Sequence, residues 1–140
     1  MSFQVRPGLA TGSRKTVLII GGDAVSRGGL ARIINRAPDF IVCGQAENSA
    51  KAVAAVTKLR PDVALVNVQL DGSRGLDSIK ALRSLYPALA IIASVHDEHA
   101  LAVQAMKLGA SGFVMDENFI GSLRRALSKV KTLPQPRTKQ

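Results

Sequence analysis

Residues 60–85 read RPDVALVNVQLDGSRGLDSIKALRSL and contain one complete strand, loop and helix. Val63–Val66 is a continuous run of apolar residues, which is typical of a strand buried on both faces. Val68–Arg74 follows as a loop. Apolar side chains then recur at helical spacing, and this helix is expected to end before Pro87, because the residue before a proline disfavours the helical conformation. The apolar positions of this helix are Leu76, Ile79, Leu82 and Leu85.

The same alternation of a short apolar run and a helical segment repeats on both sides of this unit. We expect the other strands at Thr16–Ile20, Phe40–Cys43, Leu89–Ala93 and Phe113–Met115. We expect the other helices at Ala24–Arg36, at Ser49–Leu59 behind an Asn48 cap, from an Asp97 cap to Leu108, and at 120–130. This alternation predicts an α/β fold: a doubly wound, five-stranded parallel sheet with helices on both faces. Its functional crevice is expected at the carboxyl ends of the strands.

The composition is that of one ordinary globular domain. With 140 residues, 46% hydrophobic and 21% charged, the chain is long enough for one core and too short for two. No apolar run approaches the roughly 20 residues that cross a bilayer, and the first 15 residues lack the apolar core of a secretory signal. The one cysteine, Cys43, excludes an internal disulfide, and we expect it in the core. These features predict a cytoplasmic protein that does not bind membranes.

The net charge of +9 comes from the two ends of the chain. Residues 16–120 hold ten basic and ten acidic side chains, and the nine other basic residues lie outside that stretch. Glycines and prolines predict flexible basic tails over 1–15 and 132–140, with the folded domain over 16–131. Because a neutral body with basic ends is a weak nucleic-acid signature, solvated tails are the simpler interpretation, and nucleic-acid binding through the tails is the alternative.

Four segments together resemble the receiver domain of two-component response regulators. They are VLIIGGDAVSRGGL (17–30), RPDVALVNVQLDGSRGLD (60–77), LAIIASVHDE (89–98) and LGASGFVMDE (108–117). The resemblance covers residues 16–131 and looks closest to the branch that usually carries a helix-turn-helix DNA-binding domain. It implies a (βα)5 receiver fold of the flavodoxin-like type.

The resemblance also implies chemical groups at the strand ends, and this sequence departs from most of them. A working receiver has an acidic pair that holds Mg²⁺ after the first strand, a nucleophilic aspartate after the third, and a lysine after the fifth. The matching positions hold Gly21 and Gly22, Asn67, and Asp116. Only Ser94 keeps the hydroxyl expected after the fourth strand, and Phe113 lies at the position of the family's switch aromatic.

These departures remove the phosphorylation chemistry that the resemblance implies. The Asn67 amide is not a carboxylate nucleophile, Mg²⁺ loses its ligands, and Asp116 would repel a phosphoryl group. The Asn67 amide is expected either to donate to the Asp116 carboxylate or to face water. An alignment shifted by one residue makes Gly22 and Asp23 a half-retained pair, and Asp23 with Asp116 could hold a cation weakly. A phosphoacceptor role for Asp71 or Asp23 stays an alternative.

Two further patterns carry less weight. The glycines of GGDAVSRGG (21–29) invite a phosphate-loop interpretation, but no lysine follows at the Walker spacing, so backbone flexibility is favoured. His96 and His99 lie three residues apart without a third ligand at matching spacing, and we expect no metal and no cofactor.

The segment HALAVQAMKL (99–108) has more apolar residues than one buried stripe can hold. Some of them should form an exposed apolar patch, which commonly marks an interface. In the family, the fourth helix, fifth strand and fifth helix form a frequent dimer and output surface. The predicted partner-binding residues are Leu101, Val103, Met106, Arg124 and Arg125.

The sequence therefore predicts a degenerate, single-domain response regulator that is not an enzyme. It would dock on a sensor histidine kinase or another response regulator and form a homodimer. The alternatives are a phosphoacceptor that uses a non-standard residue, nucleic-acid binding through the tails, and a small-molecule site in the crevice.

Overall fold

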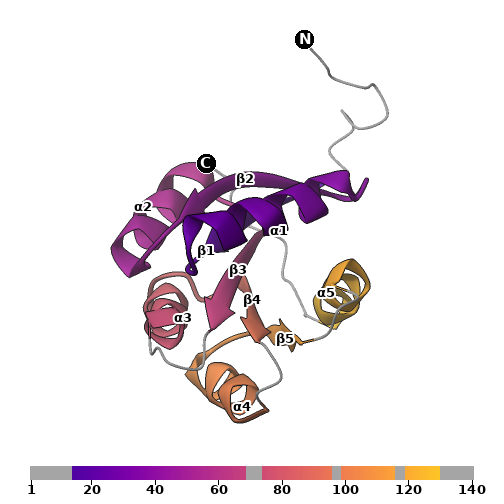
Figure 1. The fold of residues 1–140 in the computed structure, drawn as a ribbon. Coiled ribbons are helices and arrows are strands. Elements are labelled where there is room, and N and C mark those ends of the chain that lie inside the picture. Colours follow the sequence, from indigo (N-terminus) through magenta and orange to yellow (C-terminus); the bar gives the residue numbers. More distant parts are fainter. Residues whose placement is uncertain (1–13, 69–73, 96–98, 116–118, 130–140) are drawn as a thin grey trace.

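The computed structural model describes residues 14–68, 74–95, 99–115 and 119–129 (Figure 1). The strands are β1 Lys15–Ile20, β2 Phe40–Ala46, β3 Val63–Val68, β4 Ala90–Val95 and β5 Gly112–Val114. The helices are α1 Ala24–Arg36, α2 Ser49–Leu59, α3 Arg74–Leu85, α4 His99–Leu108 and α5 Phe119–Ser128. No helix within these ranges has the length and apolar content that a membrane span requires.

The strands form one parallel sheet in the order β2-β1-β3-β4-β5, which confirms the predicted doubly wound fold. One core cluster packs α2, α3 and α4 against one face, and a second packs α1 and α5 against the other. β3 and β4 are buried along their whole length, as strands covered on both faces must be. The strand order reverses between β1 and β3, so the carboxyl ends of these strands border the crevice that such sheets provide for function.

Several element boundaries differ from the sequence prediction. Val68 belongs to β3 because the ladder continues through its pairing with Val95, and Arg74 begins α3, so neither residue lies in the predicted loop. β5 begins and ends one residue earlier than expected. β1 begins at Lys15, and the Arg14 guanidinium donates to the Phe40 carbonyl oxygen at 2.8 Å. Arg14 and Lys15 thus contact β2, although both precede residue 16, where the folded domain is predicted to begin.

Cys43 lies at an irregularity in the sheet. Val17 pairs with Val42 and Leu18 pairs with Gly44, so the register skips Cys43. A residue left out of the ladder in this way forms a bulge and bends the strand. Cys43 is partly buried and packs against the core cluster, and this burial raises the pKa of its thiol.

Helix ends follow the expected capping chemistry. The Asn48 side chain accepts from the Lys51 amide at 2.9 Å, as the sequence predicts, and Asp23 caps α1 in the same way. Gly109 takes a φ of +120° directly after α4, which is the conformation that favours glycine at a helix carboxyl end. Asp97, the predicted cap of α4, lies outside the described residues.

An ion pair fastens α5 to the turn before β2. The Arg124 Nε and Nη2 atoms donate to the two carboxylate oxygens of Asp39 at 2.7 and 2.8 Å. The hydrogen bond from Arg124 lowers the pKa of Asp39 below its ordinary 3.8. A lowered folded-state pKa stabilises the fold above the unfolded value, and this stabilisation is lost as the pH falls through the folded-state pKa.

We expect Arg124→Gln to lower the urea midpoint of unfolding slightly at pH 7, because exposed pairs are screened by water. The deficit should shrink as the pH falls below 3.8 and should close below the lowered folded-state pKa of Asp39, where the carboxyl is protonated in both states. Urea titrations of both proteins from pH 7 to pH 2.5 measure this. A deficit that stays constant with pH would mean that Arg124 acts through packing alone.

Candidate functional site

The carboxyl edge of the sheet brings four of the predicted pocket residues together. Gly21 and Gly22 follow β1 directly, while Asn67 and Ser94 are register partners near the ends of β3 and β4. Asn67 is 9% exposed and Ser94 is 8% exposed, so both polar side chains lie below the surface. Asp116 and Asp71 lie outside the described residues, and so does the predicted contact between Asn67 and Asp116.

The two glycines form a left-handed turn that lies against Asn67. Their φ angles are +85° and +77°, in the region where side chains other than glycine are strained. The Asn67 Nδ2 atom donates to the Gly21 carbonyl oxygen at 3.1 Å. A Cβ atom at Gly22 would lie 2.8 Å from that Nδ2 atom. The turn therefore occupies the space beside Asn67 and has no room for a side chain in this conformation.

Asp23 serves as the cap of α1. Its Oδ1 atom accepts from the Ser26 amide at 2.7 Å, and this hydrogen bond lowers the pKa of Asp23. Arg27 supports the same turn, because its guanidinium donates to the Gly22 carbonyl oxygen and to Gln45 Oε1, the latter at 3.2 Å. Arg27 was not singled out by the sequence analysis, since its partners Gly22 and Gln45 come together only in the fold.

A cavity of about 320 Å³ opens beside these residues, between α1, α5 and the ends of β3, β4 and β5. We call it the crevice. Its polar lining comes from Ser26, Asn67 and Ser94, and its apolar lining includes Leu30, Ile33 and Phe119. Ser26, Leu30 and Ile33 lie on one side of α1, because their spacing of four and three residues is the helical repeat, and this spacing can be seen in the sequence.

The predicted partner-binding residues divide into two groups. Val103 and Met106 on α4 are 53% and 41% exposed, and Phe113 on β5, which was predicted as the switch aromatic, is 40% exposed; we call these three residues the α4 patch. Leu101 instead packs against the core. Arg124 is paired with Asp39, as described above, and Arg125 Nη2 donates to Ser122 Oγ at 3.0 Å. His99 is exposed at the start of α4, and its predicted neighbour His96 lies outside the described residues.

Comparison with known proteins agrees with this geometry. The family model described as the response regulator receiver domain matches residues 17–128. The transcriptional regulatory protein DegU of Brevibacillus brevis is 30% identical over 81% of this chain and 49% of its own length. A protein-glutamate methylesterase/protein-glutamine glutaminase of Pyrococcus abyssi is 35% identical over 74% of this chain and 29% of its own length. The chain thus spans about half, or less, of these relatives.

Solved structures show the same fold. The receiver domain of the putative response regulator NarL from Mycobacterium tuberculosis has a TM-score of 0.69 and 26% identity, over 83% of this chain and 94% of that one. A LuxR-family response regulator from Aurantimonas has a TM-score of 0.75 and 22% identity, over 86% and 90% of the two chains. The family match and the fold together define a receiver domain. The chain belongs to the response regulator receiver domain family of two-component systems.

Proposed function

We propose that this receiver is degenerate and acts by docking on a sensor histidine kinase or another response regulator, without accepting a phosphoryl group. The observation that carries the proposal is the hydrogen bond of 3.1 Å from Asn67 Nδ2 to the Gly21 carbonyl oxygen. An amide nitrogen that donates in this way offers no nucleophilic oxygen at the position where the resemblance expects an aspartate.

The surroundings of Asn67 support the same conclusion. Mg²⁺ binds through hard oxygen ligands, usually carboxylates, and the turn after β1 presents glycines where the acidic pair is expected. The adjacent carboxylate of Asp23 is engaged with the amino end of α1. The phosphoryl-transfer chemistry of a receiver therefore lacks both its nucleophile and its metal ligands in this proposal.

Two surfaces are suited to docking. The crevice combines buried hydroxyl and amide groups with apolar walls, a lining that accepts a partner side chain. The α4 patch exposes three large apolar side chains, and clustered exposed apolar groups commonly mark interfaces. We assign the crevice to the kinase or partner regulator and the α4 patch to a homodimer.

A double variant tests the homodimer. Val103→Glu with Met106→Glu should raise the dimer dissociation constant at least about 30-fold, because two uncompensated charges enter an apolar interface on each subunit. Sedimentation velocity over a concentration series measures it. Gln104→Glu is the matched control, since it adds a charge at an exposed α4 position between the two altered residues and should leave the dimer intact. A monomeric natural chain, or an unaffected double variant, would contradict this assignment.

A further inference from the structure

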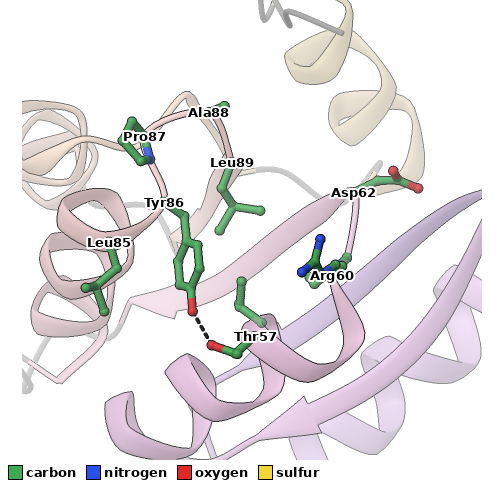
Figure 2. A pocket seen from close by; sticks show the side chains of 10 residues that line it. Thr57, Arg60, Asp62, Leu85, Tyr86, Pro87, Ala88 and Leu89 are labelled. Carbon is green, nitrogen blue, oxygen red and sulfur yellow. Dashed lines mark hydrogen bonds between the residues drawn. The ribbon is translucent and has the colours of Figure 1, made fainter. Parts of the chain in front are cut away.

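A second pocket lies at the opposite end of the sheet from the crevice. Figure 2 shows it between the carboxyl end of α2, which carries Thr57, and the turn between α3 and β4, which carries Tyr86 to Leu89. Its volume is about 340 Å³, within the range of small-molecule sites. It is formed at the amino ends of β3 and β4, so it is distinct from the strand-end site.

The lining of this pocket is mainly apolar, with a few polar groups. Leu89 is buried, whereas Leu85 is 56% exposed at the pocket's edge. The hydroxyl of Tyr86, at the start of the α3–β4 turn, hydrogen-bonds to the hydroxyl of Thr57 and so links this turn to α2 (Figure 2). The side chain of Pro61 is buried beneath the pocket. An exposed leucine beside a concave apolar surface is the arrangement that an apolar ligand would cover.

Arg60 contributes a positive charge to the lining. It has a φ of +48° and a ψ of +61°, and it is the one residue other than glycine with a positive φ in the described part of the chain. Glycine or asparagine is the usual residue in this conformation at the end of a helix. Arginine is therefore not the residue that the backbone favours here, and its presence in a strained conformation suggests a use for its side chain.

The acidic residue of the pocket is held by the fold. The Asp62 Oδ2 atom accepts from the Thr16 amide at 2.8 Å and from the Thr16 hydroxyl at 3.2 Å. These bonds fasten the start of β3 to the start of β1. In Figure 2 the Asp62 carboxylate points away from Tyr86, and Arg60 is the cationic residue of the lining.

We propose that this pocket binds a small apolar carboxylate. The apolar body lies against Leu85, Tyr86 and Leu89, and the carboxylate accepts charge-assisted hydrogen bonds from the Arg60 guanidinium. The planar guanidinium matches two carboxylate oxygens, so an acid is preferred over the amide of the same shape. This inference does not depend on the state of Asn67 or on docking at the crevice.

The probe is 4-phenylbutyrate, with 4-phenylbutyramide as its neutral match. Titration of the ¹⁵N-labelled full chain, followed by amide chemical shifts, should give saturable changes at Thr57, Arg60, Tyr86 and Leu89. The acid should bind at least about fivefold more tightly than the amide at low salt, and added salt should reduce this preference. Arg60→Asn should abolish the preference and leave the amide's affinity within about twofold, because asparagine tolerates the left-handed conformation.

Arg32→Asn is the control for net charge, since it removes one positive charge from α1 on the other face of the sheet and should keep the preference. The proposal is overturned by shifts that map to Ser26 and Ser94 instead, or by no saturable change up to about 10 mM probe. It is equally overturned if acid and amide bind alike, or if Arg60→Asn keeps the preference.

Discussion

No phosphoryl adduct should appear on this protein after incubation with Mg²⁺ and an autophosphorylated sensor kinase from its own genome. Asn67→Asp alone should remain at least about 100-fold slower than a working receiver. Metal coordination stabilises such a transition state by several kcal/mol, and each 1.36 kcal/mol is a factor of ten in rate. Intact-mass spectrometry over time measures the adduct on each variant.

The geometry of the glycine turn explains why one substitution is not enough. Asn67→Asp restores a nucleophile, but the left-handed turn at Gly21 and Gly22 still brings no carboxylate beside it. The matched comparison is a variant that combines Asn67→Asp with Gly21→Asp, Gly22→Asp and Asp116→Lys, which restores every group that the resemblance expects. Adduct on that variant and none on Asn67→Asp would show that the acidic pair and the lysine together supply what the single substitution lacks.

The same mixtures also test docking. The natural chain should co-elute with the kinase in size-exclusion chromatography whether or not Mg²⁺ and phosphate are present, because crevice contacts do not require either. An adduct on the natural chain would contradict the proposal, and peptide mapping would then show whether Asp23 or Asp71 carries it. If neither an adduct nor co-elution is observed, the proposed docking on the kinase is wrong.

Gly75→Ala should lower the free energy of unfolding by about 2–3 kcal/mol, which is the cost of overpacking a site that cannot relax. Gly75 lies in the first turn of α3 and is buried. A Cβ atom there would lie 2.4 Å from the Asn67 carbonyl oxygen and 3.1 Å from the Val68 Cα atom. Both neighbours belong to the backbone of β3, so α3 must move away from the sheet to accept the methyl group.

Gly29→Ala is the matched control, because it is the same substitution within a helix and has the opposite expected sign. Apart from the chain neighbours and the backbone of α1 itself, no heavy atom lies within 4 Å of a Cβ atom built at Gly29. Alanine there should stabilise α1 by roughly 0.5–1 kcal/mol, since glycine loses more backbone entropy on folding. Urea unfolding at pH 7, followed by circular dichroism, measures both. Equal effects of the two substitutions would show that helix propensity, rather than the contact with β3, decides the result.

The fold could be predicted from the sequence because its signals are local. The apolar runs at Val63–Val66 and Leu89–Ala93 are buried on both faces, and only a covered parallel sheet provides such an environment. Asn48 capped its helix as predicted, since capping needs only residues three apart. The strand ends were less certain: Val68 continues β3 because of a pairing with Val95, which lies on another strand.

The sequence predicted the residue types of the candidate site but not the contacts between them. The order of the motifs was enough to compare the residues at these positions with the groups that a working receiver needs; the positions are Gly21, Gly22, Asn67 and Ser94. The left-handed turn and its hydrogen bond to Asn67 could not be predicted, because the bond joins residues 46 positions apart. The same holds for Arg124, which the sequence analysis treated as partner-binding and which pairs with Asp39 across 85 positions.

The sequence by itself determined the class of fold and the chemical groups available at each strand end, since both depend on residue type and on short-range periodicity. Only the tertiary structure decided which groups meet: the glycine turn against Asn67, α5 against Asp39, and the two turns that enclose the pocket at Arg60. Those contacts depend on the order of the strands in the sheet and on the packing of the helices against it. Secondary-structure propensity, which acts between near neighbours in the chain, does not set the distance between residues far apart in the sequence.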